Sequence, residues 1–150
     1  MVSAHDVAAY ILREQGPLSA MKLQKLVYYA QAWSLVWDDR PLFHERIEAW
    51  VNGPVVRELY ERHKGRFELR DWPAGNPEAL DADGRATVHA VLGYYGGRNA
   101  QTLSDMTHAE LPWREARHGL SDRDRGAREI TLASLAEYYG SLPPADAAQA

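Results

Sequence analysis

The chain has 150 residues, of which 45% are hydrophobic and 25% are charged, a balance typical of an ordinary globular domain with its own core. Its formal net charge of −4 argues against nucleic acid as the main partner, because phosphate binding relies on a concentrated positive field. The chain contains no cysteine, which excludes disulfides, thiolate-held metals and a cysteine nucleophile. The first ten residues lack a basic segment followed by a long apolar run, so we expect a cytoplasmic protein without a secretory signal.

The first 40 residues predict two helices joined by a short link. Ser3 occupies the N-cap position of a helix that ends at Gly16 and Pro17, and Ser19 occupies the same position for a second helix. Residues 22–37 of this second helix are apolar around most of its circumference, as expected of a helix buried inside a domain. Polar interruptions and its length argue against a membrane span. We therefore expect it to be the central helix, and it should end at residues 38–41.

The period of the sequence changes in residues 42–51. Alternate residues from Phe43 to Val51 are mostly apolar, which predicts a strand packed on helices. Gly53 and Pro54 then predict the start of a helix, with Gly53 as its cap and Pro54 in the first turn, where a missing N–H does no harm. Phe67 and Leu69 alternate with charged residues and suggest a short strand beside residues 42–51.

Helical spacing returns in the C-terminal half. Apolar residues from Val88 to Tyr95 recur at helical spacing and predict a helix that ends at residues 96–97, and residues 99–108 predict another. A short helix over 111–117, a charged loop over 119–128 and a last helix capped by Thr131 follow. The sequence thus predicts an α+β fold that is predominantly α-helical. We expect a single compact domain over residues 1–142, with a central buried helix, a small antiparallel sheet of short strands, and a disordered tail over 143–150.

Motifs for chemistry are weak. His108, Ala109 and Glu110 have the H-x-E shape of zinc deaminases, but those enzymes also need a P-C-x-x-C element. We therefore interpret His108 as a structural side chain at a helix end, where imidazole can meet free carbonyls. The remaining histidines form no HExxH pair, and no GxSxG elbow or GxGxxG loop is present. The sequence predicts no catalytic residue, no metal site and no cofactor.

Two segments are candidates for contact with a protein partner. Trp72 lies in a loop rich in proline and glycine and is expected to be an exposed aromatic anchor, together with Arg66 and Arg70. The charged loop is the second candidate, through Arg114, Arg117, Arg123 and Arg125. For both segments a solvated loop is the alternative.

Lysines and tryptophans in the predicted elements have two interpretations. Lys22 and Lys25 at the start of the central helix could bind an acidic or aromatic partner, but we favour side chains that extend from a buried helix to solvent. Trp33, Trp50 and Trp113 lie in patterned elements and are expected to belong to the core.

Three strings resemble one protein family in the same order. They are MKLQKLVYYAQ at residues 21–31, IEAW and GPVV on either side of residues 51–52, and THAELPW at residues 107–113, where Leu111 is inserted before the usual Pro112 and Trp113. This combination resembles the Panacea domain of the SocA-like antitoxin family, which is also described as GepA-like and phage-associated. The resemblance covers about residues 3 to 140.

The resemblance implies a small, mostly helical domain that acts as an antitoxin. Members lie beside a toxin gene and neutralise the toxin protein by binding it, and phage defence is an expected role. Two alternatives stay open: an adaptor that delivers the toxin to the ClpXP protease, and a small-ligand or enzymatic domain with a site near His108. The family provides no catalytic residue, and its motif residues coincide with predicted core, cap and turn positions: Lys22, Gln24, Lys25, Tyr28, Trp50, Gly53, Pro54, His108, Pro112 and Trp113. The identity of the toxin and any homo-oligomer stay open.

Overall fold

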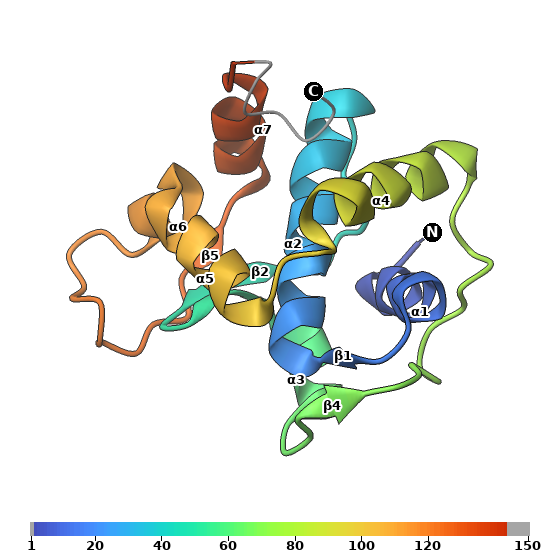
Figure 1. Cartoon of the computed structure of the whole chain (residues 1–150). Helices are drawn as coiled ribbons and strands as arrows, with labels where there is room; N and C mark the ends of the chain where they lie inside the picture. The colour runs from blue at the N-terminus through green and yellow to red at the C-terminus, as the bar shows by residue number, and fades with distance from the viewer. Residues whose placement is uncertain (1, 144–150) are drawn as a thin grey trace.

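Helix α2 (Ala20–Trp37) runs through the middle of the molecule in the computed structural model, which describes residues 2–143 (Figure 1). Every residue from Leu23 to Ser34 is buried. The helices around α2 are α1 (Ala4–Gln15), α4 (Ala82–Tyr95), α5 (Ala100–Ala109) and α7 (Leu132–Gly140), and each of them contacts it. The predicted central buried helix is confirmed.

Short strands form two small antiparallel sheets. In the larger sheet, β2 (Ile47–Trp50) lies between β3 (Gly53–Val56) and β5 (Glu129–Ile130). In the smaller one, β1 (Leu18–Ser19) pairs with β4 (Glu68–Leu69). Two short helices, α3 (Arg57–His63) and α6 (Leu111–Ala116), complete the fold. The predicted α+β class, predominantly α-helical with short antiparallel strands, is confirmed.

Helix caps follow directly from the local sequence. The Ser3 hydroxyl accepts the Asp6 N–H at 3.3 Å, and the Asp6 carboxylate accepts the Ser3 N–H at 2.9 Å, which makes a capping box. The Ser19 hydroxyl accepts the Lys22 N–H at 3.1 Å, and Thr131 caps α7 in the same way. These predicted caps are confirmed.

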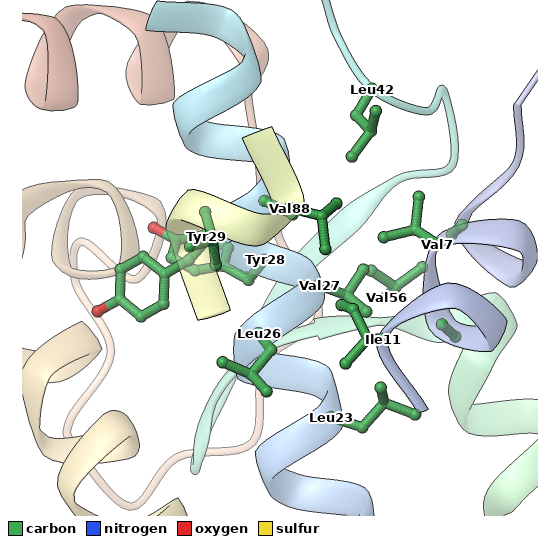
Figure 2. Packing of buried hydrophobic residues seen from close by; sticks show 14 of the residues in the cluster. Val7, Ile11, Leu23, Leu26, Val27, Tyr28, Tyr29, Leu42, Val56 and Val88 are labelled. Carbon is green, nitrogen blue, oxygen red and sulfur yellow. The ribbon is translucent and has the colours of Figure 1, made fainter. Parts of the chain in front are cut away.

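The core lies on both sides of α2. Figure 2 shows Val7 and Ile11 of α1 pointing toward Val27 and Val56, whereas the rings of Tyr28 and Tyr29 lie on the other side of α2. All of these side chains are buried. Apolar burial on two sides explains why α2 has no polar face over its middle turns.

The predicted strand over residues 42–51 is too long, since only Ile47–Trp50 forms a strand. In the residues before Ile47, the Gln31 side chain takes the place of a neighbouring strand. The Gln31 amide accepts the Leu42 N–H at 2.7 Å and donates to the Phe43 carbonyl at 2.7 Å, so this backbone is satisfied without a strand partner.

The prediction that Phe67 and Leu69 lie beside this strand is wrong. Glu68 and Leu69 pair with Ser19 and Leu18 instead, and the Phe67 side chain is 84% exposed. The prediction that Gly53 and Pro54 start a helix is also wrong, because both lie in β3 and α3 begins at Arg57. Apart from Pro143, the predicted tail lies outside the described residues.

No helix within residues 2–143 is both long enough and apolar enough to span a membrane.

Candidate functional site

A pocket with a volume of about 790 Å³ lies against the first turns of α2. Its other walls are the β2–β3 hairpin, α3 and the loop before β5. A volume of this size is in the range of pockets that hold a small ligand or an inserted side-chain cluster. The lining residues are Ala20, Met21, Gln24, Lys25, Trp50, Val51, Asn52, Val55, Arg57, Tyr60, His63, Arg125, Gly126 and Ala127.

Two side chains of α2 complete the outer edge of β3. The Gln24 amide oxygen accepts the Val56 N–H at 2.9 Å, and its nitrogen donates to the Val56 carbonyl at 3.2 Å. The Lys25 ammonium donates to the Pro54 carbonyl at 3.1 Å. Proline suits this edge because it has no N–H that would need a partner there. Pairing with α2 therefore places Gly53 and Pro54 in a strand rather than a helix.

Gly53 leaves room for the Lys25 side chain. Its φ of +121° is a conformation that L side chains rarely adopt, and a Cβ atom added to it would lie 2.6 Å from Lys25 Cε. Glycine is therefore required here both by the backbone conformation and by the close approach of Lys25.

Lys25 is a buried lysine without an acidic partner. The residue is 1% exposed, and no carboxylate within residues 2–143 lies at ion-pair distance from it. Burial lowers the pKa of Lys25 to about 7. The expectation that this side chain extends to solvent is wrong, because its ammonium is held at Pro54. Lys22 is half-buried and donates to the Gly96 carbonyl at 2.6 Å.

Trp50 and Tyr60 give the pocket an aromatic wall. The Trp50 ring is half-buried, meets the Tyr60 ring edge-on at 4.8 Å, and lies beneath the Arg57 guanidinium at 5.6 Å. Its indole N–H donates to Glu48 at 2.8 Å, and Arg57 donates to the same carboxylate oxygen at 3.2 Å. The prediction that Trp50 belongs to the core is therefore wrong, since the ring forms part of the pocket wall.

His63 closes one side of the pocket as a neutral ring. The Gln24 amide nitrogen lies 3.0 Å from His63 Nε2. Since the Gln24 oxygen already accepts from Val56, its nitrogen is the donor and His63 Nε2 accepts. Burial lowers the pKa of His63, and the nearby Lys25 charge adds to this effect. His63 therefore offers no positive charge of its own near neutral pH.

A second polar cluster lies further along α2. The same oxygen of Glu110 accepts hydrogen bonds from the Tyr29 hydroxyl at 2.7 Å and the Tyr139 hydroxyl at 2.8 Å. The Tyr28 and Tyr139 hydroxyls are 3.0 Å apart, and Tyr95 stacks on Tyr29 at 3.9 Å. Burial raises the pKa of Glu110, and burial also raises the pKa of Tyr28, Tyr29 and Tyr139 well above the usual value. These groups satisfy one another inside the protein.

His108 and Trp113 form a stack behind the β2–β3 hairpin. The two rings lie 4.1 Å apart, and the Trp113 indole donates to the Trp50 carbonyl at 2.7 Å. Burial lowers the pKa of His108, followed by the effect of Lys25. Within residues 2–143 His108 Nε2 has no hydrogen-bond partner, so this nitrogen does not make the expected bond to a helix-end carbonyl. Trp33 and Trp113 are buried, which confirms that they belong to the core.

Arg117 is buried, so its predicted role as an exposed partner contact is wrong, and so is the alternative of a solvated side chain. Its guanidinium lies over the Trp113 ring at 5.0 Å and donates to the Ala49 carbonyl at 3.1 Å. It also donates to the Ser121 carbonyl at 3.0 Å. Because these bonds cross from the loop to β2, Arg117 holds the charged loop against the sheet.

Trp72 is 6% exposed, so its predicted role as an exposed anchor is wrong. Its ring stacks against His5 of α1, and its indole N–H donates to His5 Nδ1 at 3.1 Å. This contact attaches the loop that contains Trp72 to α1. The other arginines predicted to contact a partner are exposed, namely Arg66, Arg70, Arg114, Arg123 and Arg125. Of these, only Arg125 lines the pocket.

His5, Glu45 and Glu58 also approach one another, with one potential ligand atom of each within 4.8 Å of the others. Glu45 already accepts the Ala4 N–H at 2.9 Å. Since His5 Nδ1 accepts from Trp72, a neutral His5 carries its proton on Nε2 and keeps no free ring lone pair for a metal. We therefore assign no metal to this cluster, which the sequence did not reveal because its members lie far apart in the chain.

The sequence model of the family described as antitoxin SocA-like, Panacea domain, matches residues 23–114, which is more than half of the chain. The chain belongs to this family. Comparisons with curated proteins and with solved structures gave no match.

The matched Panacea segment contains the two side chains that complete β3, the β2–β3 hairpin and the stack of His108 on Trp113. Most of the pocket therefore lies within the family segment, whereas Arg125 lies beyond its end at residue 114. The sequence suggested Lys25 as a possible contact for an acidic or aromatic partner, an interpretation that we did not favour, and it did not predict the pocket. The sequence signal for the pocket was Lys25, a charged residue within a helical stretch that is predicted to be buried.

Proposed function

We propose that this Panacea protein is the antitoxin of a toxin–antitoxin system and neutralises a cognate protein toxin by binding it directly. The observation that supports the proposal is membership of the SocA-like antitoxin family over residues 23–114. We place the pair in the cytoplasm, with the toxin encoded in the adjacent reading frame and a role in phage defence.

The contacts of the motif residues support binding rather than catalysis. Gln24 and Trp113 donate hydrogen bonds to backbone carbonyls, and Tyr29 donates to Glu110. Their polar atoms thus stabilise the fold instead of converging on a reacting group. In contrast, Trp50, Tyr60 and Arg57 gather on the pocket wall, and these residue types dominate the energetics of protein interfaces.

Co-expression with the protein from the adjacent reading frame tests the proposal. We expect rescue of growth and a stable complex on gel filtration, both of which survive His108→Ala because the ring of this residue stacks on Trp113 and does not line the pocket. Loss of rescue in a folded His108→Ala protein that still forms the complex would instead indicate chemistry at that site. Absence of any complex with a toxic neighbour contradicts direct binding.

The same assay in a strain without ClpP separates occlusion from degradation. We expect rescue without the protease, because a bound antitoxin blocks the toxin by itself. If rescue requires the protease although antitoxin and toxin still form a complex, delivery of the toxin to ClpXP replaces occlusion as the mechanism.

A further inference from the structure

The pocket beside Lys25 is lined by three basic side chains and, within residues 2–143, by no acidic one. Lys25, Arg57 and Arg125 come from α2, α3 and the loop before β5. The whole chain carries a net charge of −4, so this local excess of positive charge opposes the general balance. A concave site lined by one sign of charge concentrates groups of the opposite sign.

Two of the three basic side chains have no carboxylate partner within residues 2–143. The Lys25 ammonium has three N–H groups, of which one is donated to the Pro54 carbonyl. Arg125 is exposed and makes no ion pair within the described part of the chain, whereas Arg57 is paired with Glu48. Lys25 and Arg125 are therefore basic lining residues with hydrogen-bond donors left for an anionic group in the pocket. Carboxylates form strong charge-assisted hydrogen bonds with both side-chain types.

Part of the remaining wall is apolar or aromatic. Trp50 is held by its hydrogen bond to Glu48 and by edge-on contact with Tyr60, and Met21 and Val55 also line the pocket. A bare inorganic anion would leave this surface uncovered. A carboxylate carried by an apolar or aromatic group covers the wall and reaches the cations, so it is the chemistry that fits both parts.

We propose that this pocket receives a segment of the toxin in which an acidic residue is flanked by an apolar or aromatic one. The carboxylate pairs with Lys25 and Arg125, and the apolar side chain packs on Trp50 and Tyr60. This inference rests on the proposed function and specifies the surface and the chemistry through which the antitoxin recognises its toxin.

Two exposed arginines of one loop provide a matched test. Arg125 lines the pocket and Arg123 does not, and neither makes an ion pair within residues 2–143. In isothermal titration with the toxin, we expect Arg125→Glu to weaken binding by at least about tenfold. Arg123→Glu should leave the Kd unchanged. Trp50→Ala, confirmed as folded by circular dichroism, should weaken binding by about 30-fold.

A probe that does not depend on the toxin tests the chemistry of the pocket. In ¹⁵N-resolved NMR, 3-phenylpropionate should shift the signals of the Trp50 indole N–H and the Gly126 amide, since both residues line the pocket. The neutral analogue 3-phenylpropionamide should bind about tenfold more weakly because it lacks the charge. Arg125→Glu should abolish this difference between the two compounds, and Arg123→Glu should preserve it.

The outcomes are separable. Equal binding of the acid and the amide, or shifts confined to another surface, overturns the assignment of the pocket to a carboxylate. Toxin binding that is unchanged in both Arg125→Glu and Trp50→Ala overturns the docking site, and a small carboxylate is then the occupant if phenylpropionate still binds. If the wild-type protein binds no toxin, the proposed function fails, and the NMR comparison still decides what the pocket holds.

Discussion

Two polar regions beside α2 differ in how their charges are matched. Around Glu110, the hydroxyls of Tyr29 and Tyr139 donate to one carboxylate oxygen, so the polar atoms of this cluster bind one another. Around Lys25, one ammonium bond goes to Pro54, and no carboxylate within residues 2–143 lies at ion-pair distance. The first region holds the fold together, and the second retains binding capacity for a group from outside.

Both regions depend on neighbouring turns of the same helix. Gln24 and Lys25 precede Tyr28 and Tyr29 by one turn, and all four side chains are buried. Burial alone therefore does not separate a structural residue from a binding residue in this protein. What separates them is whether the partner of each polar group lies in the same chain.

The largest expected contrast is between Tyr29→Ala and Trp50→Ala. Tyr29 is 0% exposed and stacks on Tyr95, so its removal should reduce the free energy of unfolding by roughly 3–5 kcal/mol. Trp50 is half-buried on the pocket wall, and its removal should cost less than about 2 kcal/mol. Urea unfolding measures both values. Equal losses of unfolding free energy in the two variants would contradict the difference between the two regions.

Gly53→Ala tests the close approach of Lys25 to the hairpin. We expect the free energy of unfolding to fall by roughly 2–3 kcal/mol, because the positive φ is strained for alanine and its Cβ would lie 2.6 Å from Lys25 Cε. The loss should be smaller in a Lys25→Ala background, where only the strain of the backbone remains. Gly97→Ala is the control, since nothing lies within 4 Å of its added Cβ. Similar losses at both glycines contradict the proposed contact.

Lys25→Met should alter how stability depends on pH. The folded pKa of Lys25 is about 7 and its ordinary value is 10.5, so between these values the unfolded chain binds one more proton than the folded one. Wild-type stability should therefore rise relative to Lys25→Met as the pH increases from 7 toward 10, by up to about 1.4 kcal/mol per pH unit. Urea unfolding at pH 6, 8 and 9.5 measures the difference. A constant difference contradicts the burial of an ionisable Lys25.

The smallest effect is expected from Glu110→Gln. The amide oxygen can still accept from Tyr29 and Tyr139, so the change in stability at pH 7 should stay within about 1 kcal/mol. Because burial raises the pKa of Glu110 above 4.5, the wild type should lose stability relative to this variant as the pH rises from 4.5 toward the raised pKa. Glu110→Ala, which removes the acceptor, should cost roughly 2–3 kcal/mol. Equal behaviour of both variants in thermal unfolding would show that the hydroxyls find other partners.

Features that depend on nearby residues were predictable from the sequence. Ser3, Ser19 and Thr131 cap helices because each bonds to an N–H three residues further on. The burial of residues 23–34 follows from a helix that is apolar on nearly all sides.

Features that depend on distant partners were not predictable. Pro54 suits the first turn of a helix by local rules, but Lys25, which lies 29 residues earlier, holds its carbonyl at the edge of a strand. Trp72 has the sequence context of an exposed loop residue, yet it is buried against His5, which lies 67 residues earlier in the chain. Arg117 is surrounded by charged residues in the sequence, and its burial follows from its bond to the Ala49 carbonyl.

The completed edge of β3 limits how any partner can approach the molecule there. An open edge strand offers its backbone to another chain, which can add a strand and extend the sheet. At β3 the outward carbonyl of Pro54 and both backbone groups of Val56 are already taken by Lys25 and Gln24. A partner that added a strand at this edge would first have to displace two buried side chains. The proposed recognition beside β3 therefore uses side chains, which vary between partners, and not the backbone, which every protein shares.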